Sequence, residues 1–423
     1  MVKQQSEQDR GSTPTAADGL ATGDVDIASR ADQRRIRELA DELIDSGAST
    51  GELRAAGADP DRPLDLRVAI KLALSKHALR RSTWSGRLGV VFAMWGEQRR
   101  LRPRGEGNPT GEDALHVKLD QLEWLFSGSD VDWRLYPVDD GDPEDSAAVA
   151  AERAAQHGCG HRVEVLRLAE AIPASTGPLA GLGHVDQSRK GGAIVHGAEV
   201  ALSEGCDAIV MTDADNSVNL GQIGLLLSPF AEGTEVVIGD RKHPESVLVK
   251  AEARWGPGIV VLRHMQRMVG RAIFDRGLRD TQAAFKLYGA TTLADVLATP
   301  STYGFAFDSD WLYAAIANDR SIEPVPFAFI DSFAESASIA QGPMTTWESL
   351  LRGLVDAARA RAVDHDEAMA AVIDDYAVVS NLDVVVQNVP PQLSGVADSE
   401  LGRRQLMTPD ELRNWLDGLL AGT

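Results

Sequence analysis

Short apolar runs alternate with stretches of helical periodicity along the middle of the chain. The apolar runs are "LGVVFAMW" (88–95), "WRLYPV" (133–138), "RVEVLRL" (162–168), "DAIVMT" (207–212) and "EVVIG" (235–239). Hydrophobic positions recur at helical spacing in 112–126, 143–157 and 187–204. Because strands that alternate with helices build parallel sheets covered on both faces, this region predicts an α/β domain with a largely parallel sheet.

Helical patterns without strands flank this region on both sides. Residues 1–30 are polar and small, which predicts a disordered tail, and 31–85 predict a helical N-terminal extension in which Ile36 and Leu39 share a face. Beyond about residue 345, "WESLLRGLVDAARARA" is helical again. The expected organisation is therefore a central domain over 86–340 and a mainly helical C-terminal extension over 341–423.

Composition narrows the possible functions. The formal net charge of the 423-residue chain is -21, which argues against a general nucleic-acid binder. Two cysteines cannot form a disulfide framework, and no apolar run approaches the length of a membrane span. The first residues lack the apolar core of a signal peptide. We therefore expect a cytoplasmic protein without a membrane span, and we leave its oligomeric state open, with a homo-oligomer as one option.

Two acidic pairs follow predicted strands. Asp139 and Asp140 end one strand, and Asp213 and Asp215 follow another. Ligands of parallel sheets bind beyond the carboxyl ends of the strands, and two carboxylates one residue apart can share one Mg2+ or Mn2+. The alternative for both pairs is an ordinary acidic turn, with the residues after Asp140 serving as helix-terminal charges.

"SRKGGAIVHGAEVAL" (188–202) opens a predicted helix. Lys190 could provide a cation for a diphosphate, and Gly191 and Gly192 could let the backbone approach a ligand closely. The alternative is a plain helix start. "RRLRPR" (99–104) is expected to be a mobile loop.

A basic segment stands out in this acidic chain. Residues 241–279 contain nine lysines and arginines against three acidic residues, and Arg263, Arg267 and Arg271 recur along one helical face. This pattern predicts either a phosphate-bearing partner or a solvated face paired with acidic neighbours. Farther on, Asp308 and Asp310 enter a helix, where either could be a general base or could orient an arginine; the alternative is that Asp308 caps the helix.

Seven pieces, taken in order, resemble a family 2 glycosyltransferase with the GT-A fold. They are "VDDGDPEDS", "KGGAIVHG", "TDADNS", "VIGDR", "DTQAAFKLY", "FAFDSDWLY" and "IEPVPFAFID". Within this family, the pieces resemble those of the dolichyl-phosphate glucosyl- and mannosyltransferases. The resemblance implies that Asp139, Asp140 and Lys190 contact the nucleotide-sugar donor. It also implies that Asp213 and Asp215 bind Mg2+ or Mn2+, with Asp215 favoured as the direct ligand.

The resemblance also implies roles on the acceptor side. Arg241 and Arg254 fall where the lipid-phosphate enzymes hold an acceptor phosphate, and Asp280, Gln282 and Asp310 fall in the acceptor-side catalytic segment. The chain lacks the basic stretch that those enzymes carry after the last strand, where it has "FIDSFAESASIAQGP", and it lacks their membrane segments.

These departures favour a small soluble acceptor, anionic if the basic segment contacts it. The predicted function is an inverting transfer from a UDP- or GDP-sugar, with Asp310, Asp308 or Asp280 as base if the acceptor is a hydroxyl. Two alternatives stay open: a sugar nucleotidyltransferase, and a binding protein that retains the fold without activity.

Overall fold

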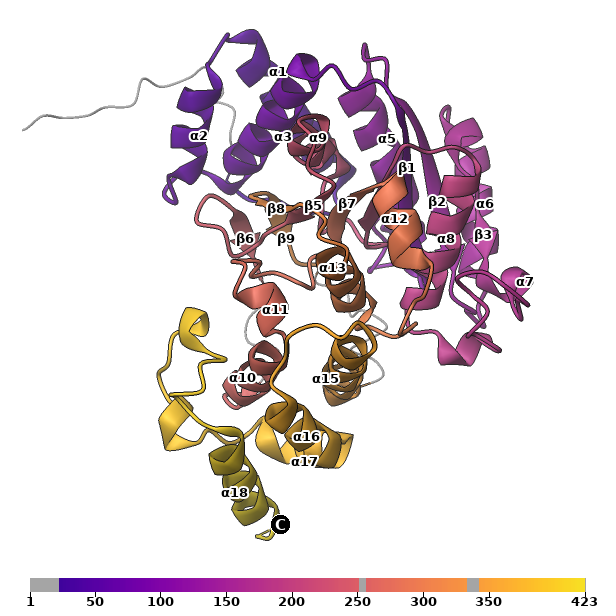
Figure 1. The fold of residues 1–423 in the computed structure, drawn as a ribbon. Coiled ribbons are helices and arrows are strands. Elements are labelled where there is room, and N and C mark those ends of the chain that lie inside the picture. The colour runs from indigo at the N-terminus through magenta and orange to yellow at the C-terminus, as the bar shows by residue number, and fades with distance from the viewer. Residues whose placement is uncertain (1–22, 251–255, 333–341, 423) are drawn as a thin grey trace, which may run out of the picture.

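A seven-stranded sheet crosses the centre of the computed structural model, which describes residues 23–250, 256–332 and 342–422 (Figure 1). The strands lie in the order β3-β2-β1-β4-β7-β5-β8. Their bounds are β1 Arg87–Met94, β2 Asp132–Asp139, β3 Leu166–Arg167, β4 Ala208–Thr212, β5 Val236–Gly239, β7 Phe285–Gly289 and β8 Ile322–Val325. Only β7 runs antiparallel to its neighbours. A small parallel pair, β6 Val247–Val249 and β9 Ala328–Ile330, stands beside the main sheet. The predicted α/β class is confirmed.

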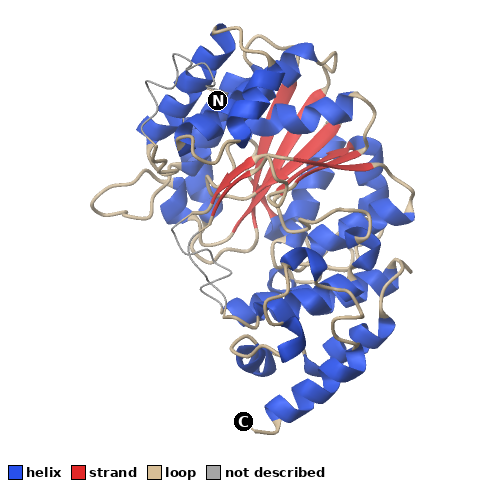
Figure 2. Cartoon of the chain, turned by 90° about the vertical axis from the view of Figure 1, so that its left-hand side faces the viewer, coloured by secondary structure: helices blue, strands red, loops and turns tan. Residues whose placement is uncertain are grey.

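Helices cover both faces of the sheet (Figure 2). Successive residues of β1 belong to two different cores, because side chains alternate across a strand: Val91 faces one core, and Val90 and Phe92 face the other. On the Val91 side lie α8 Gly191–Ser203, α12 Ala290–Leu297 and α13 Phe307–Ala317. On the other side lie α5 Ala114–Phe126, α6 Ser146–Ala155 and α9 Ile223–Ala231.

The N-terminal extension consists of α1 Arg30–Asp45, α2 Thr50–Ala58 and α3 Leu64–Arg81. These helices bury a third apolar cluster and pack against α9 and the β6–β9 pair. Of the predicted tail, residues 1–22 lie outside the described residues. Ile27 and Ala28 are buried, and the Ser29 hydroxyl accepts from the Asp32 amide at the start of α1. The folded part therefore begins before residue 30.

The C-terminal extension consists of α15 Pro343–Ala360, α16 Glu367–Tyr376, α17 Val379–Val385 and α18 Pro409–Leu420. It packs on α10 Ile259–Val269 and α13, and it shares their core, so it continues the central domain. Short helices complete the fold: α4 Gln98–Leu101, α7 Leu168–Ala171 and α11 Arg271–Phe274. Within the described residues, none of the helices combines the length and the apolar character that crossing a bilayer requires.

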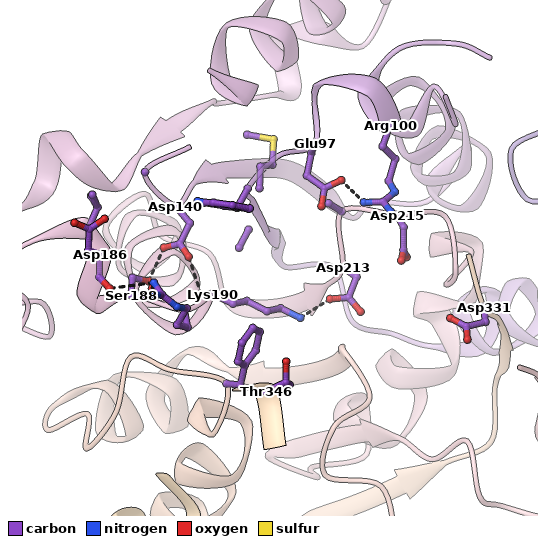
Figure 3. A pocket seen from close by; sticks show the side chains of 18 of the residues that line it. Glu97, Arg100, Asp140, Asp186, Ser188, Lys190, Asp213, Asp215, Asp331 and Thr346 are labelled. Atoms are coloured by element: carbon purple, nitrogen blue, oxygen red, sulfur yellow. Dashed lines mark hydrogen bonds and ion pairs between the residues drawn. The ribbon is translucent and has the colours of Figure 1, made fainter. Parts of the chain in front are cut away.

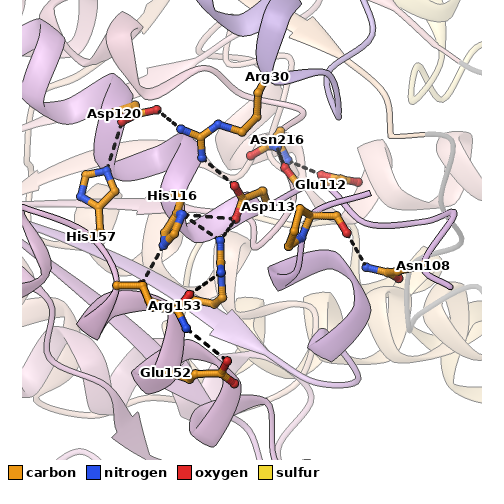
Figure 4. A network of polar contacts seen from close by, with 12 residues as sticks. Arg30, Asn108, Glu112, Asp113, His116, Asp120, Glu152, Arg153, His157 and Asn216 are labelled. Carbon is orange, nitrogen blue, oxygen red and sulfur yellow. Dashed lines mark hydrogen bonds and ion pairs between the residues drawn. The ribbon is translucent and has the colours of Figure 1, made fainter. Parts of the chain in front are cut away.

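A polar network fixes α1 to the central domain (Figure 4). The Arg30 guanidinium donates to Asp113 at 2.6 Å and to Asp120 at 2.7 Å. Arg153 of α6 donates to the other Asp113 oxygen at 2.5 Å. Burial alone would raise the pKa of Asp113, but hydrogen bonds from His116, Arg30 and Arg153 outweigh it and lower the pKa to about 2. The charged carboxylate thus links three elements.

Replacing Asp113 with asparagine is expected to lower the free energy of unfolding at pH 7. Because the pKa of Asp113 is lower in the folded chain, its charge stabilises the fold above pH 4, and this contribution disappears as the pH falls from about 4 to about 2. We expect a loss of roughly 1–2 kcal/mol, below the full linkage value because the Arg30 side chain is 40% exposed. Urea denaturation of both proteins should show this difference at pH 7 and a smaller one toward pH 3. An equal difference at both pH values would contradict the role of the charge.

Candidate active site

A cavity of about 320 Å³ opens at the carboxyl ends of β1, β2 and β4, which are neighbours in the sheet (Figure 3). Each strand is followed by acidic residues there, as expected for ligand sites of parallel sheets. The polar lining includes Glu97, Arg100, Asp140, Asp186, Ser188, Arg189, Lys190, Asp213, Asp215, Asp331 and Thr346. Several of the residues predicted from separate motifs thus meet in one cavity.

Asp213 and Asp215 leave the end of β4 in different electrostatic states. The Lys190 ammonium pairs with Asp213 and, although burial opposes it, lowers the pKa of that carboxyl. Asp215 forms no ion pair with the described residues; its Oδ1 accepts only the Ser217 amide, at 3.0 Å. Burial and the neighbouring charges of Asp213 and Glu112 raise the pKa of Asp215. The Asp215 carboxylate is therefore the group that most needs a cation.

The donor set suits a hard divalent ion. Among the described residues, no group of three or more His, Cys, Asp or Glu side chains could hold a metal by itself. Mg2+ and Mn2+ are commonly held by one or two carboxylates together with substrate phosphates, so a complete protein cage is not required. Two aspartates at a partly open cavity, one of which forms no ion pair within the part of the chain that the structure describes, fit such an ion.

Asp140 organises the turn that presents Lys190. Its two oxygens accept the Ser188 hydroxyl and, at 2.7 Å, the Lys190 amide. Lys190 has a φ of 71°, a region that residues other than glycine rarely adopt, so the turn needs this support. Burial raises the pKa of Asp140 to about 6. Asp140 lines the cavity, but both of its oxygens already accept hydrogen bonds from Ser188 and Lys190 of the protein itself.

Asp139 lies differently from its neighbour. Its carboxylate accepts the amides of Gly141 and Asp142 at 2.9 Å each and that of Ala147 at 3.2 Å. It is buried and lies outside the cavity lining. The structure therefore places Asp139 as a support of its own turn.

The two glycines after Lys190 make close contacts within the protein itself. A Cβ on Gly191 would lie 2.6 Å from the Tyr303 carbonyl, and one on Gly192 would lie 2.7 Å from the Ser188 hydroxyl. They let α8 begin tightly against residues 188 and 303. That they also bring the backbone near a ligand stays a prediction.

The loop after β1 supplies residues that the sequence analysis missed. The expectation of a mobile loop over 99–104 is wrong at Arg100, which is buried, pairs with Glu97 and donates to Glu112 at 3.2 Å. Glu112 also accepts the Asn216 amide at 2.9 Å and the Ser332 hydroxyl at 2.6 Å, and so ties this loop to the segment after Asp215. The position of Glu97 and Arg100 in the sequence could have identified them as site residues, because they follow a strand that ends at the same sheet edge as Asp213.

Of the residues expected on the acceptor side, Arg241 and Asp280 bind each other. Two guanidinium nitrogens of Arg241 donate to the two Asp280 oxygens at 2.7 Å each, and its amide donates at 3.0 Å. Burial of Asp280 by itself would raise its pKa, but the charge and the hydrogen bonds of Arg241 outweigh this effect and lower the pKa to about 2. Such a carboxylate is a weak proton acceptor. Gln282 lies 3.5 Å from the Ser309 hydroxyl and outside the cavity lining, and Arg254 falls outside the described residues.

Asp308 and Asp310 of α13 have separate partners. Asp308 accepts from the fully buried Lys286 ammonium at 2.5 Å, and its Oδ2 forms no hydrogen bond with the described residues. The expected helix cap at Asp308 is not formed. Burial opposes the charges of Lys190 and Arg241, but Asp213 for Lys190 and Asp280 for Arg241, with a smaller contribution from Asp308, outweigh it and raise the pKa of both. Asp308 itself lies outside the cavity lining.

Asp310 is fully buried and lies away from the cavity. Its oxygens accept from Arg361 at 2.8 and 3.2 Å and from the Ser301 amide at 3.1 Å. The structure thus places Asp310 as an anchor for the C-terminal extension.

Two curated proteins are similar to parts of this chain. A polyprenol monophosphomannose synthase of Mycolicibacterium smegmatis is 26% identical over 228 residues, which cover 52% of this chain and 78% of the relative. An undecaprenyl-phosphate mannosyltransferase of Micrococcus luteus is 27% identical over 142 residues, which cover 33% of this chain and 56% of the relative. The predicted resemblance to family 2 glycosyltransferases of the lipid-phosphate type is confirmed. No protein-family model matches the chain.

Solved structures of glucosyl-3-phosphoglycerate synthase from Mycobacterium tuberculosis are also similar. The complex with UDP matches with a TM-score of 0.44 and 14% identity over 70% of this chain and 86% of that chain. The complex with Mn2+, UDP-glucose and phosphoglyceric acid matches with a TM-score of 0.44 and 14% identity over 70% of this chain and 85% of that chain.

Proposed function

We propose that this chain is a metal-dependent glycosyltransferase that moves a sugar from a nucleotide-sugar donor to a small soluble acceptor with inversion at the anomeric carbon. One observation carries the proposal: the Asp215 carboxylate forms no ion pair with the described residues, and it lines a cavity that also holds the Lys190–Asp213 pair. The names of the two curated relatives support sugar transfer.

The chain's own residues would hold the donor through its diphosphate. Asp215, helped by Asp213, would bind Mg2+ or Mn2+, which neutralises negative charge on the departing nucleoside diphosphate. Lys190 would bind a diphosphate oxygen, because its ammonium already points into the cavity beside Asp213. Asp140 would keep the Lys190 turn in place through its hydrogen bond to the Lys190 amide.

Among the three candidate bases, the contacts favour Asp308. Both oxygens of Asp280 and of Asp310 accept from arginine, whereas Asp308 keeps Oδ2 available. In a single displacement, an acceptor hydroxyl oxygen would bond to the anomeric carbon as the diphosphate leaves with its bonding electrons. Asp308 would accept the hydroxyl proton. An acceptor phosphate, already ionised, would need no base.

Donor binding is expected to require the divalent ion. Calorimetric titration of UDP- and GDP-sugars in Mn2+ should give at least about tenfold tighter binding than in EDTA, since one charge-assisted contact alone provides that much. Lys190→Gln should weaken the binding in Mn2+. A nucleotide sugar that binds equally well with and without the ion would contradict the proposal, and so would the absence of binding to every sugar nucleotide tested.

A sugar nucleotidyltransferase is the second candidate, favoured by the basic residue that the loop after β1 places in the cavity. Arg100, however, is already engaged by Glu97 and Glu112, which leaves it poorly placed to hold a triphosphate. The two activities differ in their products. Release of pyrophosphate from a nucleoside triphosphate and a sugar phosphate would establish the nucleotidyltransferase.

A further inference from the structure

A second cavity of about 870 Å³ lies between α10, α11 and the loop 398–405 of the C-terminal extension. We call it the basic groove and define it by Lys242, Lys250, Arg263, Arg267, Arg279 and Asp398. It shares no lining residue with the cavity that holds Asp215. Arg263 and Arg267 lie on α10, whereas Arg271, expected on the same helical face, begins α11 after a break at Gly270. The three still line one wall of the groove, and its other wall comes from a distant segment.

The charge of the groove is opposite to that of the chain. Eight lysines and arginines line it against four acidic residues, whereas the chain as a whole carries -21. A local reversal of this size concentrates anions from solution.

Internal ion pairs neutralise only part of this positive charge. Arg271, Arg403 and Arg404 pair with Asp364, Glu400 and Asp366. Three cations share the single Asp398 carboxylate: Lys242 at 3.3 Å, Arg263 at 3.3 Å and Arg267 at 2.5 Å. Lys250 and Arg279 form no ion pair or hydrogen bond with the described residues. Burial, together with the charges of Arg241 and Arg263, lowers the pKa of Lys250. The groove thus holds more cations than its own anions can neutralise.

The wall that carries Asp398 is fixed in place. Both ring nitrogens of His264 on α10 form hydrogen bonds with the C-terminal extension. One accepts the Gly402 amide at 3.0 Å, and the other bonds to the Met407 carbonyl at 2.9 Å. Gly402 has a φ of 87°, and a Cβ there would lie 2.4 Å from the Arg267 Cβ. Only glycine lets the loop sit so close to α10, so the groove is built into the fold.

The size and the residue types of the groove point to a small phosphorylated ligand. A volume of this order is typical of small-molecule sites. Arginine binds phosphoryl oxygens with a planar fork, and several arginines converge here. A nucleic acid needs a long basic face, which the strongly acidic remainder of the chain does not offer.

We propose that the basic groove binds a small ligand through its phosphoryl groups and that Asp398 competes with this ligand for Lys242, Arg263 and Arg267. The site is separate from the proposed donor site, and it does not depend on glycosyl transfer. Asp398 acts as the resident anion of the groove, so its removal should improve anion binding, whereas removal of a groove cation should impair it.

Calorimetry with inorganic pyrophosphate tests this on the full chain, with EDTA present and no sugar nucleotide. Lys250→Gln and Arg263→Gln should each weaken binding about tenfold, the effect of one lost charge-assisted contact. Asp398→Asn should tighten it severalfold. Arg276→Gln is the matched control, because Arg276 is exposed on the same segment but lies outside the groove. Since Lys250 forms no ion pair or hydrogen bond with the described residues, its replacement should leave the melting temperature unchanged.

Three results would overturn the proposal: no binding of pyrophosphate at millimolar concentration, equal binding by the Lys250 and Arg263 variants, or weaker binding by Asp398→Asn with an unchanged melting temperature. Lys190→Gln separates the two sites. Binding that disappears in this variant and persists in Lys250→Gln would place pyrophosphate in the donor cavity and reject the groove.

The phosphoryl group could come from a free metabolite or from a lipid headgroup. Cosedimentation with phosphatidylcholine vesicles, with and without phosphatidic acid, distinguishes these sources. Binding that needs phosphatidic acid and is lost in Arg263→Gln indicates a lipid headgroup. Pyrophosphate binding without vesicle binding indicates a soluble ligand.

Discussion

Replacing Asp215 with asparagine is expected to reduce sugar transfer about a thousandfold, which corresponds to roughly 4 kcal/mol of transition-state stabilisation. The cause is the loss of the cavity carboxylate that no lysine or arginine among the described residues neutralises in an ion pair. Asparagine retains the shape and an oxygen that can accept the Ser217 amide, so the turn after β4 should persist. Steady-state kinetics with the best donor from the calorimetric panel, at saturating Mn2+, measures the effect.

Asp186→Asn is the matched control for this change. Asp186 also lines the cavity, but its side chain is 83% exposed, so its charge is largely screened by water. We expect its turnover to stay within about threefold of the parent protein. If Asp215→Asn were as active as the parent protein, Asp215 could not be an essential metal ligand. If Asp215→Asn and Asp186→Asn lost activity equally, the loss would reflect a general effect of charge.

The second large effect is expected from a pair of variants on α13, Asp308→Asn and Asp310→Asn. Each breaks a buried ion pair, with Lys286 or with Arg361, and should cost about 3 kcal/mol of stability. Of the two, only Asp308 contributes to the charge that acts on Lys190 and Arg241, and only its Oδ2 forms no hydrogen bond with the described residues. With a hydroxyl acceptor, Asp308→Asn should therefore lower kcat about a hundredfold, the usual range for a lost general base. Asp310→Asn should keep nearly full turnover per folded molecule.

Melting curves and kinetics below both melting temperatures separate the stability and activity effects. Because the two variants share the stability loss, a difference in kcat reports on chemistry alone. The pH dependence of kcat adds an independent readout, since loss of a base removes the limb that falls toward acid pH. The opposite pattern, with inactive Asp310→Asn and active Asp308→Asn, would return the base role to Asp310.

The strands that are apolar along most of their length were the easiest to predict from the sequence. β1 and β4 are buried on both faces, so their residues form continuous hydrophobic runs. β7 escaped recognition as a strand because Lys286 interrupts its apolar run, and this buried lysine pairs with Asp308 and donates to the Ala283 carbonyl. β8 is short and contains Pro324, which hides a strand pattern.

Some residues of the candidate site could also be predicted, from their positions in the sequence. Asp213, Asp215 and Lys190 could be proposed because their positions at strand and helix ends place them at one sheet edge. The pairing of Arg241 with Asp280 and of Asp310 with Arg361 could not, because these partners lie 39 and 51 residues apart and meet only through tertiary packing. Arg100 was missed because a basic stretch in a loop has the same pattern whether it is exposed or buried.

The most direct test of the account is a crystal of the full chain with Mn2+ and the best nucleotide-sugar donor, measured at a wavelength where manganese scatters anomalously. We expect a manganese peak within about 2.0–2.4 Å of an Asp215 oxygen and of a donor phosphate oxygen. We also expect the Lys190 ammonium to contact the diphosphate. A donor bound in the cavity with manganese absent, or with the Asp215 carboxylate turned away from the ion, would contradict the central claim.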